Sequence, residues 1–378
     1  MTFLQLGISE HLKSVLEAEN YNKVYPIQEK AIPSILKGRD ILAIAPTGSG
    51  KTAAFVLPIL TKLKGKTITS NRHINVLVLV PTRELAIQVE QVFRSFGKSL
   101  PFPFKSFAVY GGASINPQMK SLQNVNVLVA TPGRLIELAE SNALHFSELS
   151  CLVLDEADKM LNLGFKKEVD HILSLLPTKR QNLLFSATLS PEVRKIEQLV
   201  LRNPEIIEIK SETDDLSLIQ QVGYFVTAEK KGPLLRHIIQ DGNFSQVLIF
   251  TSSTYQADLV ADKLRKNDIN AVAIHSKKSQ GKRREALADF KAGKLRVLVA
   301  TDLLSRGIDI EFLPHVINYE LPRSPKDFIH RIGRTGRAEN AGKAITLVTE
   351  EDKHHFRVIQ KKMKRWVTMI DSENIDLT

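Results

Sequence analysis

Short apolar runs rich in β-branched residues alternate with longer amphipathic stretches along most of the chain. Such runs are typical of buried strands, and the stretches between them have the 3.6-residue period of helices. Strands that alternate with helices indicate parallel sheets, so we expect an α/β fold. The predicted strands are residues 41–45, 76–80, 125–130, 151–154, 182–186, 222–226, 247–250, 272–274, 297–300, 316–318 and 345–348, and the clearest helices are 83–96, 255–266 and 280–291.

The alternation lapses around residues 203–218, where an Asn-Pro pair and the acidic run 211–215 interrupt it. A chain of 378 residues is long enough for two domains that each bury a core. We therefore predict domains at 1–208 and 218–378, joined by a linker at 209–217. The basic stretch 353–365 is expected to form the last helix, with Trp366 packed against the second domain.

An acidic tetrad, Asp155-Glu156-Ala157-Asp158, directly follows the predicted strand 151–154. Ligands of open α/β sheets bind at the carboxyl ends of the strands. Adjacent carboxylates are costly to desolvate there unless a cation or a proton transfer uses them. The tetrad alone is compatible with a solvated strand end. Together with a phosphate site, it favours Asp155 as a ligand of Mg²⁺ and Glu156 as the group that orients an attacking water.

A phosphate-binding loop follows the predicted strand 41–45 and precedes a helical stretch, which is the context that such loops require. Two glycines allow backbone N–H groups to surround phosphate oxygens. Lys51 is expected to reach the β- and γ-phosphates, and the Thr52 hydroxyl to bind Mg²⁺. The loop is Ala45-Pro46-Thr47-Gly48-Ser49-Gly50-Lys51-Thr52, with alanine where the first glycine is usual.

The composition of the chain favours one class of partner. The net charge of +11 and the pI near 9.5 favour a polyanionic partner, nucleic acid first. The single cysteine, Cys151, lies in an apolar run, where it is expected to pack as a small hydrophobe. No apolar stretch approaches the roughly 20 residues of a membrane span. We therefore expect a cytoplasmic protein that contacts no membrane.

With these elements in place, the chain resembles the DEAD-box family of ATP-dependent RNA helicases. The resemblance extends from near Phe3 to about Gln360, and 275–302 and 318–337 resemble the bacterial RhlE-like branch. The segments that match the family's motifs in order are 45–52, 81–86, 111–112, 131–134, 155–158 and 186–188 in the first domain, and 300–302, 306–309 and 330–337 in the second.

The resemblance implies two tandem RecA-like domains, each a mainly parallel sheet flanked by helices, with ATP between them and RNA across their common face. It implies that Arg334 and Arg337 reach the γ-phosphate of ATP as arginine fingers, where a guanidinium meets the spreading charge of the transition state. We expect a monomer. Residues implied to bind the ribose are Gly307 and Asp309, and those implied to couple nucleotide state to domain closure are Asp158, Ser186, Thr188 and His330.

Adenine recognition is implied for Gln28, within Pro26-Ile27-Gln28, because its amide can pair with the N6 and N7 atoms of adenine. Tyr21 stands where an aromatic residue stacks on the base, and Phe3 matches the isolated upstream aromatic residue. Three positions depart from the family pattern, with Asn20, Val24 and Tyr25 in place of glycine, proline and threonine. Outside the family context, Gln28 would be a helix-capping residue.

The RNA contacts are expected from polar residues that follow apolar strands along one rim of the first domain. Their amides, hydroxyls and guanidinium groups suit phosphates, which position a strand without reading its sequence. An ion pair of Arg83 with Glu84 or Glu90, and a turn that Arg134 simply ends, are the alternatives. The predicted RNA-binding residues are Pro81, Thr82, Arg83, Gly111, Gly112, Thr131 and Arg134, together with Gln280, Arg283 and Thr301 of the second domain. For residues 361–366, added RNA affinity from their charge and the single tryptophan is the alternative to packing as the last helix.

The motifs favour an ATP-dependent RNA helicase that separates short duplexes locally. An ATP-gated RNA clamp without turnover is disfavoured, because Lys51, Glu156, Arg334 and Arg337 are all present. A DNA translocase of the same superfamily is disfavoured by Pro26-Ile27-Gln28 and by the acidic tetrad. Discrimination of RNA from DNA through 2′-hydroxyls is implied by the resemblance alone.

Overall fold

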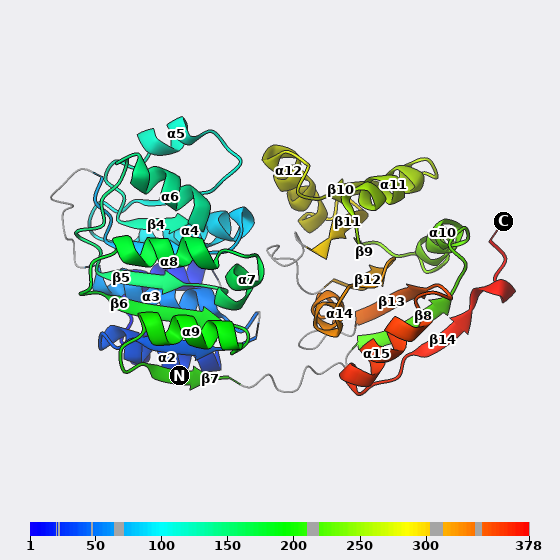
Figure 1. The fold of residues 1–378 in the computed structure, drawn as a ribbon, viewed down its shortest axis with the longest axis horizontal. Coiled ribbons are helices and arrows are strands. Elements are labelled where there is room, and N and C mark those ends of the chain that lie inside the picture. Colours follow the sequence, from blue (N-terminus) through cyan, green and yellow to red (C-terminus); the bar gives the residue numbers. More distant parts are fainter. Residues whose placement is uncertain are drawn as a thin grey trace. The chain divides into compact units, whose positions relative to one another are not determined.

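The computed structural model describes residues 1–19, 21, 23–46, 48–63, 72–209, 219–302, 313–336 and 342–377, without the side chains of residues 326 and 374. The chain divides into two compact units, 1–211 and 212–378 (Figure 1). From residue 210 on, the predicted linker at 209–217 lies outside the described residues. The predicted domain boundaries therefore stay predictions.

Unit 1 contains a seven-stranded, fully parallel sheet in the order β3-β4-β2-β5-β6-β1-β7. Its strands are β1 (Ile41–Ile44), β2 (Val76–Leu79), β3 (Ser106–Val109), β4 (Val127–Ala130), β5 (Cys151–Leu154), β6 (Gln181–Ser186) and β7 (Glu205–Glu208). Its helices are α1 (Lys13–Ala18), α2 (Pro26–Leu36), α3 (Lys51–Lys62), α4 (Arg83–Gly97), α5 (Ile115–Lys120), α6 (Pro132–Glu140), α7 (Ala157–Asn162), α8 (Lys166–Leu175) and α9 (Pro191–Val200).

Helices cover both faces of this sheet because its central strands β2, β4 and β5 are apolar at every position rather than at alternate ones. In β5, Val153 joins the core formed with α1 to α4, whereas Leu152 and Leu154 join the core formed with α6 to α9. Successive side chains of a strand point to opposite faces, so a run of apolar residues serves both cores. Figure 1 shows α8 and α9 on the face of the sheet opposite to α3.

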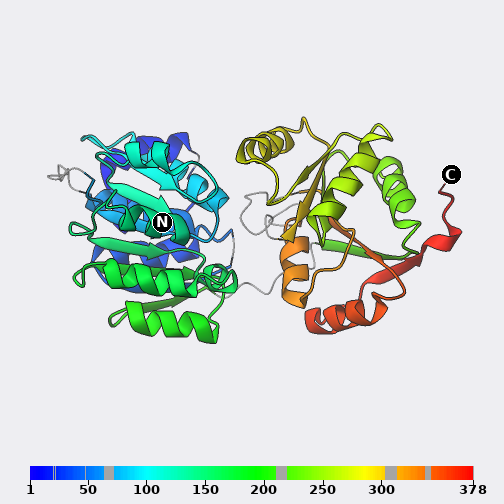
Figure 2. The ribbon, with the colours of Figure 1, turned by 45° about the horizontal axis from the view of Figure 1, so that its top comes forward.

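Unit 2 repeats this plan with a second seven-stranded parallel sheet, in the order β10-β11-β9-β12-β13-β8-β14 (Figure 2). Its strands are β8 (Ile219–Phe225), β9 (Val247–Thr251), β10 (Ala271–Ile274), β11 (Val297–Thr301), β12 (His315–Asn318), β13 (Gly342–Val348) and β14 (Thr368–Asp371). Its described helices are α10 (Lys231–Asp241), α11 (Thr254–Arg265), α12 (Gln280–Lys291), α14 (Pro325–Ile332) and α15 (Lys353–Met363). The α/β prediction is confirmed.

Three strands escaped the sequence analysis, and all three lie at sheet edges: β3, β7 and β14. An edge strand is solvated along one side, so its sequence need not form an apolar run. β7 lies in the segment where the pattern lapses, and Ile207 is its only buried residue. β14 lies beyond the last predicted helix, in a segment for which no strand was predicted, and it pairs with β8.

The prediction for the chain's end is also wrong in one respect. The basic stretch forms α15, which ends at Met363. Trp366 lies beyond the helix and is 69% exposed, so it does not pack against the domain. Val367 takes the buried position instead.

Cys151 is buried in β5, and burial raises the pKa of its thiol to about 12. The prediction that it packs as a small hydrophobe is confirmed. None of the described helices combines the length and the apolar character that a membrane span requires.

Candidate functional site

The phosphate-binding loop connects β1 to α3, as its context predicted. Gly48 and Gly50 have positive φ angles of 79° and 86°, which glycine adopts without steric cost. The Ser49 hydroxyl donates to the Pro46 carbonyl at 2.8 Å, which closes the loop on itself. Thr47 lies outside the described residues. The turn brings the N-terminus of α3, with its unpaired N–H groups and positive dipole end, to the carboxyl edge of the sheet.

Lys51, the first residue of α3, points back into this loop. Its Nζ donates to the carbonyls of Ala45 at 2.7 Å and Pro46 at 2.8 Å. Desolvation lowers the pKa of Lys51, while the charges of Asp155 and Glu156 raise it. Among the described residues, the ammonium group therefore donates to neutral carbonyls, which a phosphate can replace.

Asp155 follows β5 at the same edge and is 3% exposed. Burial and the neighbouring Glu156 raise its pKa, Lys51 opposes them, and the balance is a pKa of about 7. One carboxylate oxygen, Oδ1, accepts from the Glu156 N–H at 2.9 Å. The carboxylate is therefore poorly compensated by the described residues around it.

Glu156 is the N-cap of α7 and has left-handed backbone angles, φ 52° and ψ 46°. This conformation is uncommon for a residue with a side chain and costs about 1–3 kcal/mol. Its Oε1 pairs with Lys159 Nζ at 2.5 Å, whereas its Oε2 is buried without a hydrogen-bond partner in the described part of the chain. The strained turn aims one free carboxylate oxygen into the edge where phosphate would bind.

Asp158, Ser186 and Thr188 are brought together from α7 and the end of β6. The Thr188 hydroxyl donates to Asp158 Oδ2 at 2.8 Å, and the Ser186 hydroxyl donates to the Thr188 carbonyl at 2.7 Å. Asp158 Oδ1 also accepts from the Lys159 N–H at 3.0 Å. The three residues form one hydrogen-bonded link between the acidic tetrad and the neighbouring strand end.

Gln28 bridges two segments. Its Oε1 accepts from the Tyr25 N–H at 2.9 Å and so caps α2, and its Nε2 donates to the Gly50 carbonyl at 3.1 Å. A β-carbon on Gly50 would lie 2.5 Å from that Nε2, so only glycine allows this approach. Tyr21 contacts Phe96 edge-on, with ring centroids 5.2 Å apart. The side chain predicted to bind adenine is thus tied directly to the phosphate loop.

The predicted RNA contacts of unit 1 lie where β2, β3 and β4 end. The Thr82 hydroxyl caps α4 by accepting from Leu85 N–H at 3.3 Å. The Arg83 guanidinium packs on Gly112, whose φ is 73° and where a β-carbon would collide with it. The Gly111 N–H donates to the Thr131 hydroxyl at 3.4 Å. Pro81 directly follows Val80 in the segment that leads from β2 to α4.

Arg134 is 6% exposed and does more than end a turn. Its Nε pairs with Glu137 at 2.8 Å, and one terminal nitrogen donates to the Ala113 carbonyl at 2.8 Å. The other terminal nitrogen is buried without a partner among the described residues. A buried, unpaired guanidinium nitrogen beside backbone amides is suited to one more anionic oxygen.

Unit 2 presents a different picture at the carboxyl edge of its own sheet. Thr301 ends β11 and is buried, and the Arg283 guanidinium donates to the side-chain oxygen Oε1 of Gln280 within the first turn of α12. His330 lies in α14, and Arg334 lies just after this helix. Gly307, Asp309 and Arg337 lie outside the described residues.

Arg331 is a residue to which the sequence analysis gave no role. It is 1% exposed, and its guanidinium meets both carboxylate oxygens of Asp302, at 2.5 and 2.7 Å. It also donates to the Asn318 side chain at 3.1 Å and the Glu320 carbonyl at 2.6 Å, and it lies 5.0 Å from the centre of the Phe250 ring. In the sequence, Arg331 stands among the other charged residues of 330–337, so it resembles a surface residue and was given no role.

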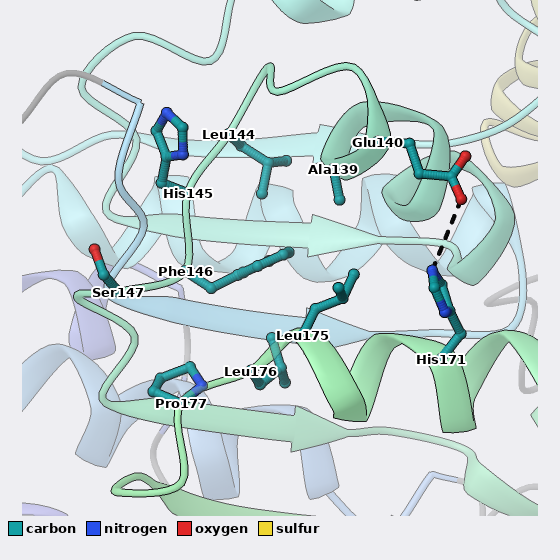
Figure 3. Close-up of a pocket in the computed structure, with 10 residues that line it drawn as sticks. All are labelled: Ala139, Glu140, Leu144, His145, Phe146, Ser147, His171, Leu175, Leu176 and Pro177. Carbon is teal, nitrogen blue, oxygen red and sulfur yellow. Dashed lines mark ion pairs between the residues drawn. The ribbon is translucent and has the colours of Figure 1, made fainter.

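A cavity of about 510 Å³ lies on unit 1 away from these residues, between α6 and α8. Figure 3 shows His171 and Glu140 at one end, with Nε2 and Oε1 3.7 Å apart, and His145 at the other. The cavity adjoins the segments that lead into β5 and β6, at the amino ends of the strands. It contains none of the predicted site residues.

Comparison with known proteins decides the family. The model of the DEAD/DEAH box helicase family matches residues 25–196, and that of the helicase conserved C-terminal domain matches 230–339. The ATP-dependent RNA helicase CshA of Limosilactobacillus reuteri is 38% identical over 96% of this chain and 72% of its own length. The chain belongs to the DEAD-box RNA helicase family.

Two further comparisons agree. The DEAD-box ATP-dependent RNA helicase CshA of Geobacillus kaustophilus is 37% identical over 96% of this chain and 78% of its own. The structure of S. cerevisiae Dbp5 bound to RNA and ADP BeF3 superimposes with a TM-score of 0.85 at 29% identity, covering 99% of this chain and 96% of that one. Both units of this DEAD-box chain therefore have the RecA-like fold. The relatives compared are CshA and DeaD helicases, so the expected RhlE-like branch finds no support among them.

Proposed function

We propose that this chain is an ATP-dependent RNA helicase that couples ATP hydrolysis to local strand separation. The observation that carries the proposal is the carboxyl edge of the sheet of unit 1, where Lys51 and Asp155 are buried beside Glu156, whose side chain is 12% exposed. No ion pair joins Lys51 to either carboxylate among the described residues. Buried groups of opposite charge that do not pair with each other suit a ligand with both negative and positive charge, such as a nucleotide phosphate with its cation.

The Thr52 hydroxyl and the Asp155 carboxylate fit Mg²⁺, a cation that takes oxygen ligands and keeps several waters in nucleotide sites. The pKa of Asp155 near 7 in the chain alone fits this role, because the carboxylate lacks a compensating cation. When bound, Mg²⁺ neutralises charge on the phosphates. We propose that the phosphates and waters supply the remaining oxygen ligands of this cation.

In the proposed reaction, Lys51 leaves the Ala45 and Pro46 carbonyls to contact the β- and γ-phosphates. Glu156 holds the attacking water with its unpartnered Oε2 and takes its proton. Gln28 selects adenine, with Tyr21 beside the base. Arg334 and Arg337 supply positive charge to the γ-phosphate from unit 2, where Gly307 and Asp309 contact the ribose. Hydrolysis then requires both units, because these arginines lie beyond the linker.

RNA is proposed to lie along the rim formed by Arg83, Gly112 and Arg134 and to continue over Gln280, Arg283 and Thr301. The guanidinium groups and amides of this rim suit phosphate oxygens, so binding depends little on base sequence. The link from Asp158 through Thr188 to Ser186 is proposed to report the nucleotide state to this rim, with His330 on the facing surface. A cytoplasmic, monomeric protein remains our expectation, and the RhlE-like branch remains a prediction.

The test is steady-state ATP hydrolysis by the full chain without nucleic acid, with single-stranded RNA and with DNA of the same sequence, beside separation of a short RNA duplex. We expect RNA alone to stimulate hydrolysis and ATP to be needed for duplex separation. Equal stimulation by DNA would favour a DNA translocase. RNA binding without turnover would favour an ATP-gated clamp.

A further inference from the structure

The end of α15 carries an exposed aromatic side chain among unpaired cations. Trp366, the single tryptophan of the chain, is 69% exposed and contacts no other ring or cation among the described residues. Lys361, Lys362 and Lys364 precede it, are exposed and form no ion pair in the described structure. Lysines at a helix C-terminus interact favourably with the helix dipole, which accounts for two of them but not for an exposed indole.

The turn that carries Trp366 is ordered. The buried side chain of Gln360 accepts from the Val367 N–H at 2.8 Å, and the Gln360 carbonyl accepts from the Arg365 N–H at 3.3 Å. Val367 is buried directly after the tryptophan. The backbone on both sides is therefore fixed while the indole projects outward, so little conformational entropy is lost when a flat ligand stacks on it.

Lys364 has a backbone conformation that is costly for a residue with a side chain. It is the C-cap of α15 with φ 55° and ψ 29°, a left-handed conformation in which glycine is favoured. A side chain there costs about 1 kcal/mol relative to glycine. Lys364 is exposed and lies three residues after Lys361, so it places another cation two residues before the tryptophan.

The same charge continues along the outer face of α15. Its exposed residues, at the helical spacing of four, include Lys353, Arg357 and Lys361, and the acidic residues Glu350 and Glu351 lie only before the helix begins. Lys353 pairs with Glu350 at 2.5 Å, so the unpaired cations lie toward the Trp366 end. We call Arg357, Lys361, Lys362, Lys364 and Trp366 the α15 patch.

The α15 patch lies apart from the predicted RNA contacts of unit 2. Trp366 precedes β14, at the amino end of an edge strand, whereas Thr301 ends β11 near the opposite edge of the same sheet. All strands of the sheet are parallel, so Trp366 and Thr301 lie at opposite ends of the strands as well as near opposite edges of the sheet. The RNA contacts predicted around Thr301 therefore do not account for the exposed cations and tryptophan of the α15 patch.

We propose that the α15 patch is a second RNA-binding site, on which an unpaired base stacks on Trp366 while the cations contact its flanking phosphates. Single strands bind in this way to grooves that combine positive charge with exposed aromatic rings. The occupant is single-stranded RNA because a polyanion with exposed bases matches both the charge and the indole. Since the chain's other RNA contacts lie across the sheet, the patch holds a segment that flanks the bound strand. This inference rests on the proposed RNA binding.

The single tryptophan makes the test specific to this site. Single-stranded RNA is titrated into the full chain while Trp366 emission and the anisotropy of labelled RNA are followed in parallel. We expect saturable quenching and protection of the emission from acrylamide. The variant Lys361→Glu/Lys362→Glu should lose the quenching, whereas Lys263→Glu/Lys266→Glu, which makes the same charge change on α11, should keep it. Circular dichroism and ATP hydrolysis without RNA should be unchanged in both.

The two readouts separate the two proposals. If anisotropy shows no RNA binding at all, the proposed function fails. If RNA binds while the emission stays constant, or if quenching survives Lys361→Glu/Lys362→Glu, the α15 patch is not an RNA site. Emission that changes with protein concentration in the absence of RNA would assign the patch to a second copy of the chain instead. For Trp366→Ala we expect RNA affinity to fall roughly 5- to 150-fold, the range of one stacked base.

Discussion

The carboxyl edges of the two sheets hold charge in opposite ways. In unit 1, Lys51 and Asp155 are desolvated and form no ion pair with any described residue, and burial shifts both pKa values toward neutrality. In unit 2, Arg331 is equally buried but meets Asp302, Asn318 and Glu320. The same fold thus supports one edge that gains from binding a ligand and one that is satisfied beforehand. The first is suited to chemistry and the second to holding its neighbours in place.

The largest effect that this difference predicts concerns Glu156. Replacing it with glutamine (Glu156→Gln) removes the base at the unpartnered oxygen but keeps the shape of the side chain. We expect kcat for RNA-stimulated ATP hydrolysis to fall about 10²- to 10⁴-fold, with ATP affinity little changed. Steady-state hydrolysis and nucleotide titration measure the two quantities. Glu140→Gln, at an exposed position of the same unit, is the control, and unchanged turnover in Glu156→Gln would remove Glu156 from the mechanism.

Arg331→Met is expected to have the largest effect on stability. It removes the guanidinium from which both Asp302 carboxylate oxygens and Asn318 Oδ1 accept, and breaking a buried ion pair from one side costs about 3–5 kcal/mol. Urea unfolding should show this loss in unit 2, while ATP binding to unit 1 persists. Arg323→Met, at an exposed position just before α14, should change the free energy of unfolding little. A loss confined to turnover would instead give Arg331 a role toward ATP.

The sequence predicts more of the carboxyl edge of the sheet in unit 1 than of the corresponding edge in unit 2. The motif residues of unit 1 follow buried apolar strands, and in a parallel sheet such positions meet at one edge. The contacts among them could not be predicted, because Gln28 approaches Gly50 only through the tertiary packing of α2 on α3. Arg331 was missed because a guanidinium in a basic segment resembles surface charge until its four acceptors are known. The edge strands β3, β7 and β14 were missed because solvent on one side permits polar residues.

A smaller effect is expected at Thr188. Thr188→Val removes the hydroxyl that Asp158 accepts from, and an unsatisfied buried acceptor costs about 1–3 kcal/mol. If this link couples ATP to RNA, the number of duplexes separated per ATP hydrolysed should fall while ATP affinity is retained. Thr188→Ser keeps a hydroxyl and should restore the ratio. Loss of ATP binding in Thr188→Val would indicate a role in the nucleotide site itself.

The smallest effect concerns pH and His315. Burial, reinforced by nearby Lys343, lowers the pKa of His315, and its ring stacks on Phe244 with centroids 3.6 Å apart. Because the folded pKa lies below the unfolded value, the unfolded chain binds the proton more tightly. The stabilisation is complete above about pH 6.5 and is lost as the pH falls toward the folded pKa. We expect a small loss of the free energy of unfolding over this range, because solvent screens the half-buried ring, and His315→Asn should flatten the dependence in urea unfolding from pH 8 to 5.

The buried position of Cys151 has a practical consequence. A thiol with a pKa near 12, enclosed in the middle of a sheet, forms almost no thiolate at neutral pH and is out of reach of alkylating reagents. Any cysteine introduced on the surface is therefore the one that reacts. One dye placed on each unit in this way would report their separation during a catalytic cycle, in the native background and without first removing a natural residue.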